Sequence, residues 1–125
     1  MRVRESKLPP PDTEARDRRR QVQKIAEATS IALPAARAAW LQADFAHVRA
    51  LLAPFTDQLE YMDSKTALAC GLLLGKADLA FDDATAAIAV FKQIRERKPM
   101  QKLARYSESP KVIDAWKQAG GLVQD

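Results

Sequence analysis

The chain has 125 residues, of which 47% are hydrophobic and 29% are charged, and its net charge is +4. This composition is typical of a globular protein and excludes a largely disordered chain. Its 23 Ala and 13 Leu outnumber the 11 Val and Ile residues together, which favours helices over strands. We therefore predict an all-α fold, a compact bundle of five or six helices that forms a single helical domain over residues 12–125.

The chain is predicted to begin with an extended tail over residues 1–11, because Pro9, Pro10 and Pro11 favour the polyproline conformation. A helix capped by Asp12 or Thr13 is expected at about residues 13–29. Arg18 and Arg19 interrupt its apolar positions. The first half of this helix has little to bury, so we expect it to project into solvent or against a partner.

Pro34 at a first-turn position predicts the start of a second helix, which runs to about residue 53. A short helix at 56–62 and a central helix at 64–75 follow, the latter ending at Gly75. Ala67, Gly71 and Gly75 recur every four residues, which predicts close packing against the Ala-rich helix expected at 83–98. After a short segment at 100–106, Ser109 and Pro110 predict a last helix at 110–119. No internal repeat is evident.

No segment is long enough to cross a membrane. The apolar run at 66–74 is about half of the roughly 20 residues that a spanning helix needs. The N-terminus lacks the apolar region of a secretory signal, and the single cysteine, Cys70, can form no internal disulfide. We therefore predict a cytoplasmic protein without a membrane partner.

Few residues are suited to catalysis or to metal binding. The single histidine, His47, follows Asp44 by three residues, a spacing more typical of a local hydrogen bond than of a catalytic pair. One His and one Cys cannot form a zinc site. The remaining candidate ligands for a hard cation are better explained as helix caps or as a solvated face: Asp57, Glu60, Asp63, Asp78, Asp82 and Asp83. We predict no enzymatic activity, no cofactor and no metal.

Residues 25–40 resemble the helix–turn–helix of bacterial regulators. Ala26 takes the place of the small residue in the first helix, Ser30 the turn position and Ile31 the apolar residue after it. The resemblance implies DNA binding by the helix that follows. That helix offers only Arg37 to base edges, which favours a packing role for the segment over sequence readout.

Charge is segregated along the chain. Residues 1–24 carry 8 basic and 4 acidic residues, residues 25–91 carry 4 and 8, and residues 92–125 carry 8 and 4. We predict that the basic ends bind the phosphate backbone of DNA or RNA, as a nucleic-acid-binding protein or as a small subunit of a nucleoprotein assembly. The predicted contact residues are Arg16, Arg18, Arg19, Arg20, Lys24, Arg37, Lys92, Arg95, Arg97, Lys98, Lys102 and Arg105. The alternative is an adaptor or self-associating protein whose basic ends dock on acidic protein surfaces.

Overall fold

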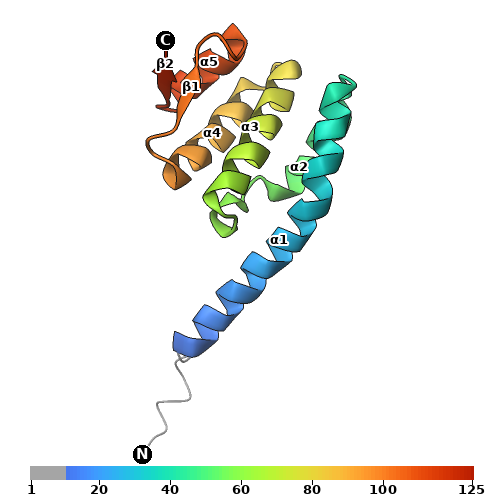
Figure 1. The fold of residues 1–125 in the computed structure, drawn as a ribbon, viewed down its shortest axis with the longest axis vertical. Coiled ribbons are helices and arrows are strands. Elements are labelled where there is room, and N and C mark those ends of the chain that lie inside the picture. The colour runs from blue at the N-terminus through green and yellow to red at the C-terminus, as the bar shows by residue number, and fades with distance from the viewer. Residues whose placement is uncertain (1–10) are drawn as a thin grey trace, which may run out of the picture.

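The computed structural model describes residues 11–125 and has the predicted all-α architecture (Figure 1). Its helices are α1 (Pro11–Leu41), α2 (Phe45–Leu52), α3 (Ser64–Ala80), α4 (Ala84–Arg97) and α5 (Pro110–Gln118). A 3₁₀ turn, η3 (Leu59–Tyr61), lies within the segment 56–62 where a short helix was predicted, and another, η2 (Ala53–Phe55), precedes that segment. Most of the predicted tail, residues 1–10, lies outside the described residues. Pro11 is the first residue of α1 and not part of a tail.

The contact between α3 and α4 is the most extensive between helices of the bundle. The predicted small-residue face of α3 is confirmed, because Ala67, Gly71 and Gly75 are all buried. A Cβ atom added to Gly71 would lie 2.8 Å from Cγ1 of Ile94, and one added to Gly75 would overlap the Phe91 ring. The predicted end of the helix at Gly75 is wrong, since α3 continues to Ala80 with Gly75 inside it.

The prediction of two helices meeting near residue 30 is wrong. Residues 11–41 form one continuous helix, α1, which contains Pro34. Ala36 and Ala39 are buried in the core, and α1 packs along α2. Pro34 itself is exposed, so the carbonyl group that its missing N–H leaves unbonded can face water. Packing of Ala36 and Ala39 in the core therefore offsets the cost of the proline, and the helix continues through Pro34.

Replacing Pro34 with Ala is expected to raise the free energy of unfolding by about 2 kcal/mol. Inside a helix Pro is about 3 kcal/mol less favourable than Ala, and the greater freedom of the unfolded Ala chain removes up to about 1 kcal/mol of that gain. Urea denaturation measures the difference. Pro54→Ala is the control, because Pro54 lies in the first turn of η2, where proline is tolerated. A Pro34→Ala protein no more stable than wild type contradicts the expected cost of this proline.

The turn between α1 and α2 has the same backbone geometry as the turn between α3 and α4, 39 residues later. Ala43 and Asp82 both have φ of 59°. In each turn the next residue, Asp44 or Asp83, donates its N–H at 2.9 Å to a carbonyl five residues back and caps the following helix with its carboxylate. The fold therefore repeats a helical hairpin that the sequence pattern did not reveal, and Asp83 rather than Asp82 is the cap.

The C-terminal segment combines a predicted helix with two strands that were not predicted. Ser109 accepts a hydrogen bond from the Val112 N–H at 3.4 Å and caps α5, as expected. β1 (Lys102–Ala104) and β2 (Leu122–Gln124) pair in parallel, with Leu103 opposite Val123. The fully buried Trp116 donates its indole N–H to the Leu122 carbonyl at 2.7 Å, which ties α5 to β2.

Candidate nucleic-acid interface

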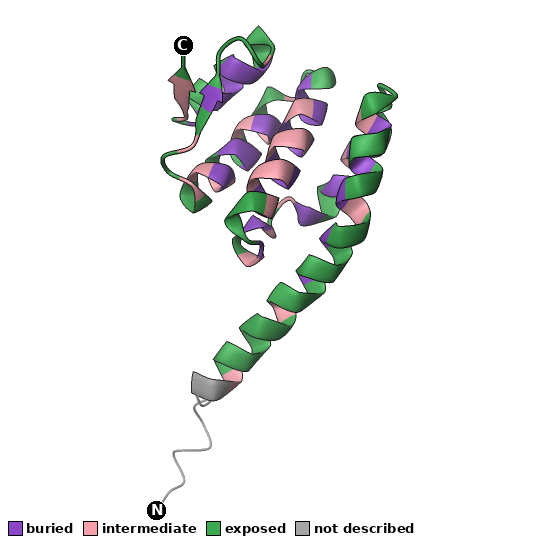
Figure 2. Cartoon of the chain, viewed as in Figure 1, coloured by how far each residue is buried: buried purple, intermediate pink, exposed green. Residues whose placement is uncertain are grey.

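The N-terminal half of α1 extends away from the rest of the bundle (Figure 1). Its residues are almost all exposed, whereas the burial in α1 is concentrated from Ile25 onward (Figure 2). Between Glu14 and Lys24 only Gln21 is partly buried. This half-helix buries little, as predicted, and Arg16, Arg18, Arg19, Arg20 and Lys24 are all exposed.

These five cations do not share one role. Arg16, Arg20 and Lys24 follow one another at intervals of four residues, so they form a stripe along one side of the helix, here named the outer basic stripe. The only ion pair in this stripe among the described residues joins Arg20 to Asp17 at 3.7 Å, and both side chains are more than half exposed. Such a pair contributes little free energy. The three cations are therefore available to a ligand.

Arg18 points instead toward the bundle. Its guanidinium lies 3.4 Å from the Glu60 carbonyl oxygen, 4.0 Å from the Glu60 carboxylate and 5.2 Å from the centre of the Tyr61 ring. Next to it Gln21 donates a side-chain hydrogen bond to Gln58 at 3.2 Å. These contacts join one side of the half-helix, at Arg18 and Gln21, to the η3 segment, while its other side faces solvent.

The C-terminal basic residues do not form a comparable stripe. Arg97 donates to the Met62 carbonyl oxygen, and Arg105 forms an ion pair with Asp125 at 2.6 Å. Arg95 is half-buried, and its guanidinium packs against Gly120. A Cβ atom added to Gly120 would lie 2.7 Å from Nη1 of Arg95. The positive φ of Gly120, 87°, and this close approach both favour glycine there. Of the predicted contact residues at this end, Lys92, Arg97, Lys102 and Arg105 are exposed, and Arg95 and Lys98 are partly buried.

The two basic segments are separated by carboxylates. Asp57, Glu60 and Glu96 surround a surface groove of about 310 Å³ together with Gln93 and Arg97. Glu60 also contacts Arg18, so this acidic surface lies between the start of α1 and the end of α4. The basic ends therefore do not merge into one continuous track for phosphates.

The resemblance of residues 25–40 to a helix–turn–helix is not matched by the structure. α1 continues without a turn through Ser30 and Ile31, so there is no separate recognition helix. Arg37 is exposed and lines a groove of about 400 Å³ between α1, η3 and the start of α3. It lies well away in sequence from the outer basic stripe.

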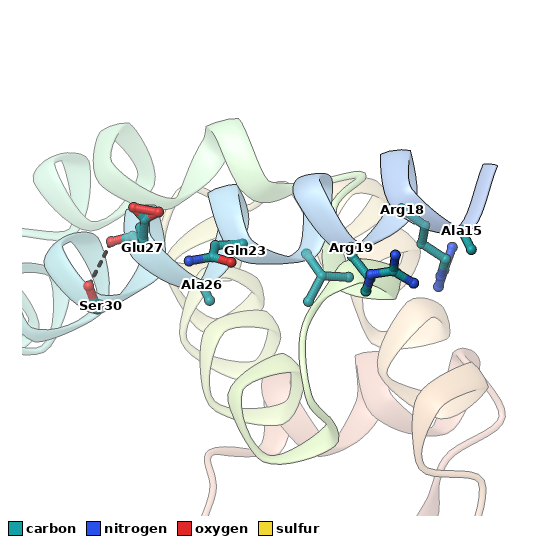
Figure 3. Close-up of a pocket in the computed structure, with 8 residues that line it drawn as sticks. Ala15, Arg18, Arg19, Gln23, Ala26, Glu27 and Ser30 are labelled. Carbon is teal, nitrogen blue, oxygen red and sulfur yellow. Dashed lines mark hydrogen bonds between the residues drawn. The ribbon is translucent and has the colours of Figure 1, made fainter. Parts of the chain in front are cut away.

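That groove was not predicted from the sequence. Val22, Ala26 and Leu33 line it from α1, and Tyr61 and Met62 line it from the η3 side. An adjoining hollow along the N-terminal half of α1 is lined by that helix alone (Figure 3). Its lining residues are Ala15, Arg18, Arg19, Val22, Gln23, Ala26, Glu27 and Ser30.

His47 and Cys70 were the residues considered for catalysis. His47 Nδ1 lies 3.9 Å from Asp44 on an exposed surface. Cys70 is buried in α3, and desolvation raises the pKa of its thiol to about 11, which opposes formation of a reactive thiolate. Within residues 11–125 no group of three or more His, Cys, Asp or Glu side chains is placed to hold a metal ion.

None of the helices in the described part of the chain combines the length and the hydrophobicity needed to span a membrane. Neither a protein-family model, nor a curated protein, nor a solved structure matches this chain.

Proposed function

We propose that this protein binds nucleic acid through the phosphate backbone, and that the outer basic stripe makes the contact. The observation that carries the proposal is the placement of Arg16, Arg20 and Lys24 on successive turns of an exposed, projecting half-helix. Exposed cations on one helix face suit phosphate contacts, and Arg adds bidentate hydrogen bonding. The stripe offers no set of side chains matched to base edges, so binding is expected to depend weakly on sequence.

Fewer residues are expected to contact phosphates than the sequence alone predicted. Arg18 is engaged with Glu60 and Tyr61, and Arg97 and Arg105 are engaged within the fold. These three side chains would have to leave existing partners before they could bind a phosphate. Lys92, Lys98 and Lys102 could contribute a secondary contact to a ligand that reaches the end of α4.

The test is the salt dependence of binding. Replacing Arg16, Arg20 and Lys24 together with Ala is expected to lower the slope of log affinity against log salt by up to about 3 units on duplex DNA, near one for each phosphate that the variant no longer neutralises. Affinity should fall by a similar factor for unrelated sequences of duplex DNA and for single-stranded RNA. Fluorescence anisotropy with labelled oligonucleotides measures both quantities.

A matched control variant removes three positive charges from the C-terminal basic segment instead. Lys92→Ala, Lys98→Ala and Lys102→Ala together should change the slope by less than about 1 unit, because these residues do not form one exposed stripe. Neither variant should melt much below wild type, since exposed charges contribute little to stability. An unchanged slope in the Arg16, Arg20 and Lys24 variant refutes the proposed interface.

A second candidate function is self-association, in which the outer basic stripe of one copy docks on the acidic surface of another. The gathering of Asp57, Glu60 and Glu96 around one groove favours it. Sedimentation velocity of protein free of nucleic acid separates the two functions. Concentration-dependent assembly that disappears in the Arg16, Arg20 and Lys24 variant would favour docking between copies.

A further inference from the structure

A groove of about 470 Å³ lies where the ends of α1 and α3 meet the segment that leads into α5. Trp40 lines it from α1, Leu79 and Ala80 line it from α3, and Val112 lines it from the first turn of α5. Leu79 and Val112 are buried and Trp40 is half-buried, so much of the wall is apolar. A space of this size suits a short stretch of peptide or a small molecule.

Lys76 of α3 places a positive charge in this groove. Its ammonium nitrogen lies 5.7 Å from the centre of the Trp40 ring and 2.8 Å from Oε1 of Glu108. The Lys76 and Glu108 side chains are 22% and 15% exposed. Among the ion pairs of residues 11–125, this is the one in which both side chains are less than a quarter exposed. A pair so far removed from water attracts more strongly than a surface pair does.

Glu108 reaches Lys76 from the loop between β1 and α5. Its neighbours in the sequence, Ser107 and Ser109, are both exposed. Glu108 is the only acidic residue that lines the groove, and Asp82 nearby forms a separate, exposed ion pair with Lys111 at 2.6 Å. The chain therefore shows directly which chemical group is held beside Lys76 and Trp40, and that group is the carboxylate of a non-helical segment.

The groove also contains space that the ion pair does not use. The volume of about 470 Å³ lies beside the Glu108 side chain, which is itself part of the wall. An ion pair with a purely structural role needs no open space next to Lys76 and Trp40. Apolar side chains of a ligand that filled this space would be removed from water against Leu79 and Val112, which is favourable.

We propose that Lys76 and Trp40 form a site for a glutamate side chain of a partner protein, and that Glu108 occupies this site in the free protein. The partner's carboxylate displaces that of Glu108 from Lys76, and the apolar residues beside it contact Leu79 and Val112. The exchange replaces one carboxylate with another, so it leaves no buried cation unpaired. Glu108 then turns toward solvent, as its place in a loop allows.

Nucleic acid is a poorer occupant of this groove. Phosphates bind cations that are exposed, whereas Lys76 is recessed and the cation at the edge, Lys111, already has Asp82 as its partner. Glu108, once displaced, would also lie close to any phosphate bound there. The proposed site uses no residue of the outer basic stripe, and it does not rest on the proposed binding of nucleic acid.

The test uses two labelled peptides of about eight residues, both acetylated and amidated. Leu residues flank a central Glu in the first peptide and a central Gln in the second, so the two differ by a single charge. By fluorescence anisotropy, wild-type protein is expected to bind the Glu peptide at least fivefold more tightly than the Gln peptide. Glu108→Gln, which removes the charge of the internal competitor, should raise the affinity for the Glu peptide at least tenfold.

Variants of Lys76 test the cation itself. Lys76→Met should bind the two peptides equally, whereas Lys76→Arg keeps the positive charge and should retain the preference for Glu. Lys65→Met is the matched control, because Lys65 is an exposed lysine at the other end of α3, and it should bind both peptides like wild type. Circular dichroism melting checks that each variant is folded.

Three results with the peptides overturn the proposal. These are no binding by wild type up to millimolar concentration, equal binding of the Glu and Gln peptides by wild type, and a Glu108→Gln protein that binds the Glu peptide no more tightly. The last result would identify Glu108 as a fixed structural partner of Lys76.

Two further outcomes would assign the groove to another occupant and so also overturn the proposal. Displacement of the Glu peptide by an oligonucleotide would identify phosphate as the ligand of Lys76. Self-association of wild type that is lost in Lys76→Met, seen by sedimentation, would identify Glu108 of a second copy as the occupant. The salt slope for nucleic acid should be unchanged in Lys76→Met, so this experiment and that on Arg16, Arg20 and Lys24 can fail independently.

Discussion

Replacing Gly75 with Ala is expected to destabilise the protein by about 2 kcal/mol, although Ala is the better helix former. Helix propensity alone would favour Ala by about 1 kcal/mol. Against this gain, the new Cβ atom would overlap the fully buried Phe91 ring, which is enclosed by the core and cannot move away easily. Overpacking of this kind typically costs about 1–3 kcal/mol, and Gly75→Leu should cost more. Urea denaturation followed by circular dichroism measures both variants.

Gly71→Ala is the matched comparison on the same helix face. A Cβ atom there would lie 2.8 Å from Cγ1 of Ile94 and 2.9 Å from Cδ2 of Leu59, which are atoms of flexible side chains. These side chains can shift by small amounts, so the net effect should stay within about 1 kcal/mol of wild type.

The double variant Gly75→Ala with Phe91→Leu provides the sharper control for Gly75. The smaller side chain at position 91 removes the overlap, so the two changes together should cost less than the sum of the single changes. Simple additivity, or a Gly75→Ala protein as stable as wild type, would contradict the close contact between α3 and α4.

The α3–α4 contact was predictable because it is encoded locally. The spacing of Ala67, Gly71 and Gly75 gives α3 a face almost without side chains, and the Ala-rich segment that follows has helical spacing. The Asp63 and Ser109 caps were predictable for the same reason, since a cap depends on backbone groups within three residues.

The course of α1 was not predictable from local preference. Pro34 is typical of a first-turn position, and nothing within the segment shows that Ala36 and Ala39 will be buried against other helices. The true break, at Ala43, depends on a residue with positive φ that is neither Gly nor Asn. The strands at 102–104 and 122–124 are equally non-local, because three residues show no alternation and pairing requires α5 to bring them together.

The exposure of the N-terminal basic residues could be predicted from the interruption of the apolar positions by Arg18 and Arg19. The contacts of the C-terminal basic residues could not be predicted in this way. Arg97 reaches a carbonyl 35 residues away, and Arg95 packs beneath Gly120. Contacts of this range leave no pattern in the sequence around either arginine. The predicted break near residue 30 also put Arg19 and Arg37 on separate helices, whereas the continuous helix places both on the same side of α1.

Loss of the Arg49 side chain is expected to destabilise the protein strongly. Its guanidinium lies 3.0 Å from the Asp78 carboxylate and 3.3 Å from that of Asp83, and it stacks over the Phe81 ring at 5.1 Å. It therefore joins α2 to α3 and to the turn that begins α4. The Asp78 side chain is only 6% exposed, and desolvation raises the pKa of its carboxyl group while Arg49 opposes that rise.

Arg49→Met is expected to lower the free energy of unfolding by about 3 kcal/mol at pH 7, the lower end of the range for leaving one partner of a buried pair uncompensated, because Arg49 is itself about a third exposed. The double variant Arg49→Met with Asp78→Asn should recover at least half of the loss, since no ionised group then remains buried at position 78. Denaturation of the wild type and of both variants in urea at pH 7 gives the three free energies.

The loss should also depend on pH with a definite sign. Without Arg49 the pKa of Asp78 in the folded state rises further above the unfolded value of about 3.9. Between these two pKa values the folded variant binds more protons than the unfolded chain, so its stability relative to wild type increases as the pH falls. The deficit of Arg49→Met should therefore be smaller at pH 4 than at pH 7, and the double variant should not show this change. An equal deficit of Arg49→Met at both pH values would show that its cost comes from the missing packing over Phe81 rather than from the unpaired Asp78 carboxylate.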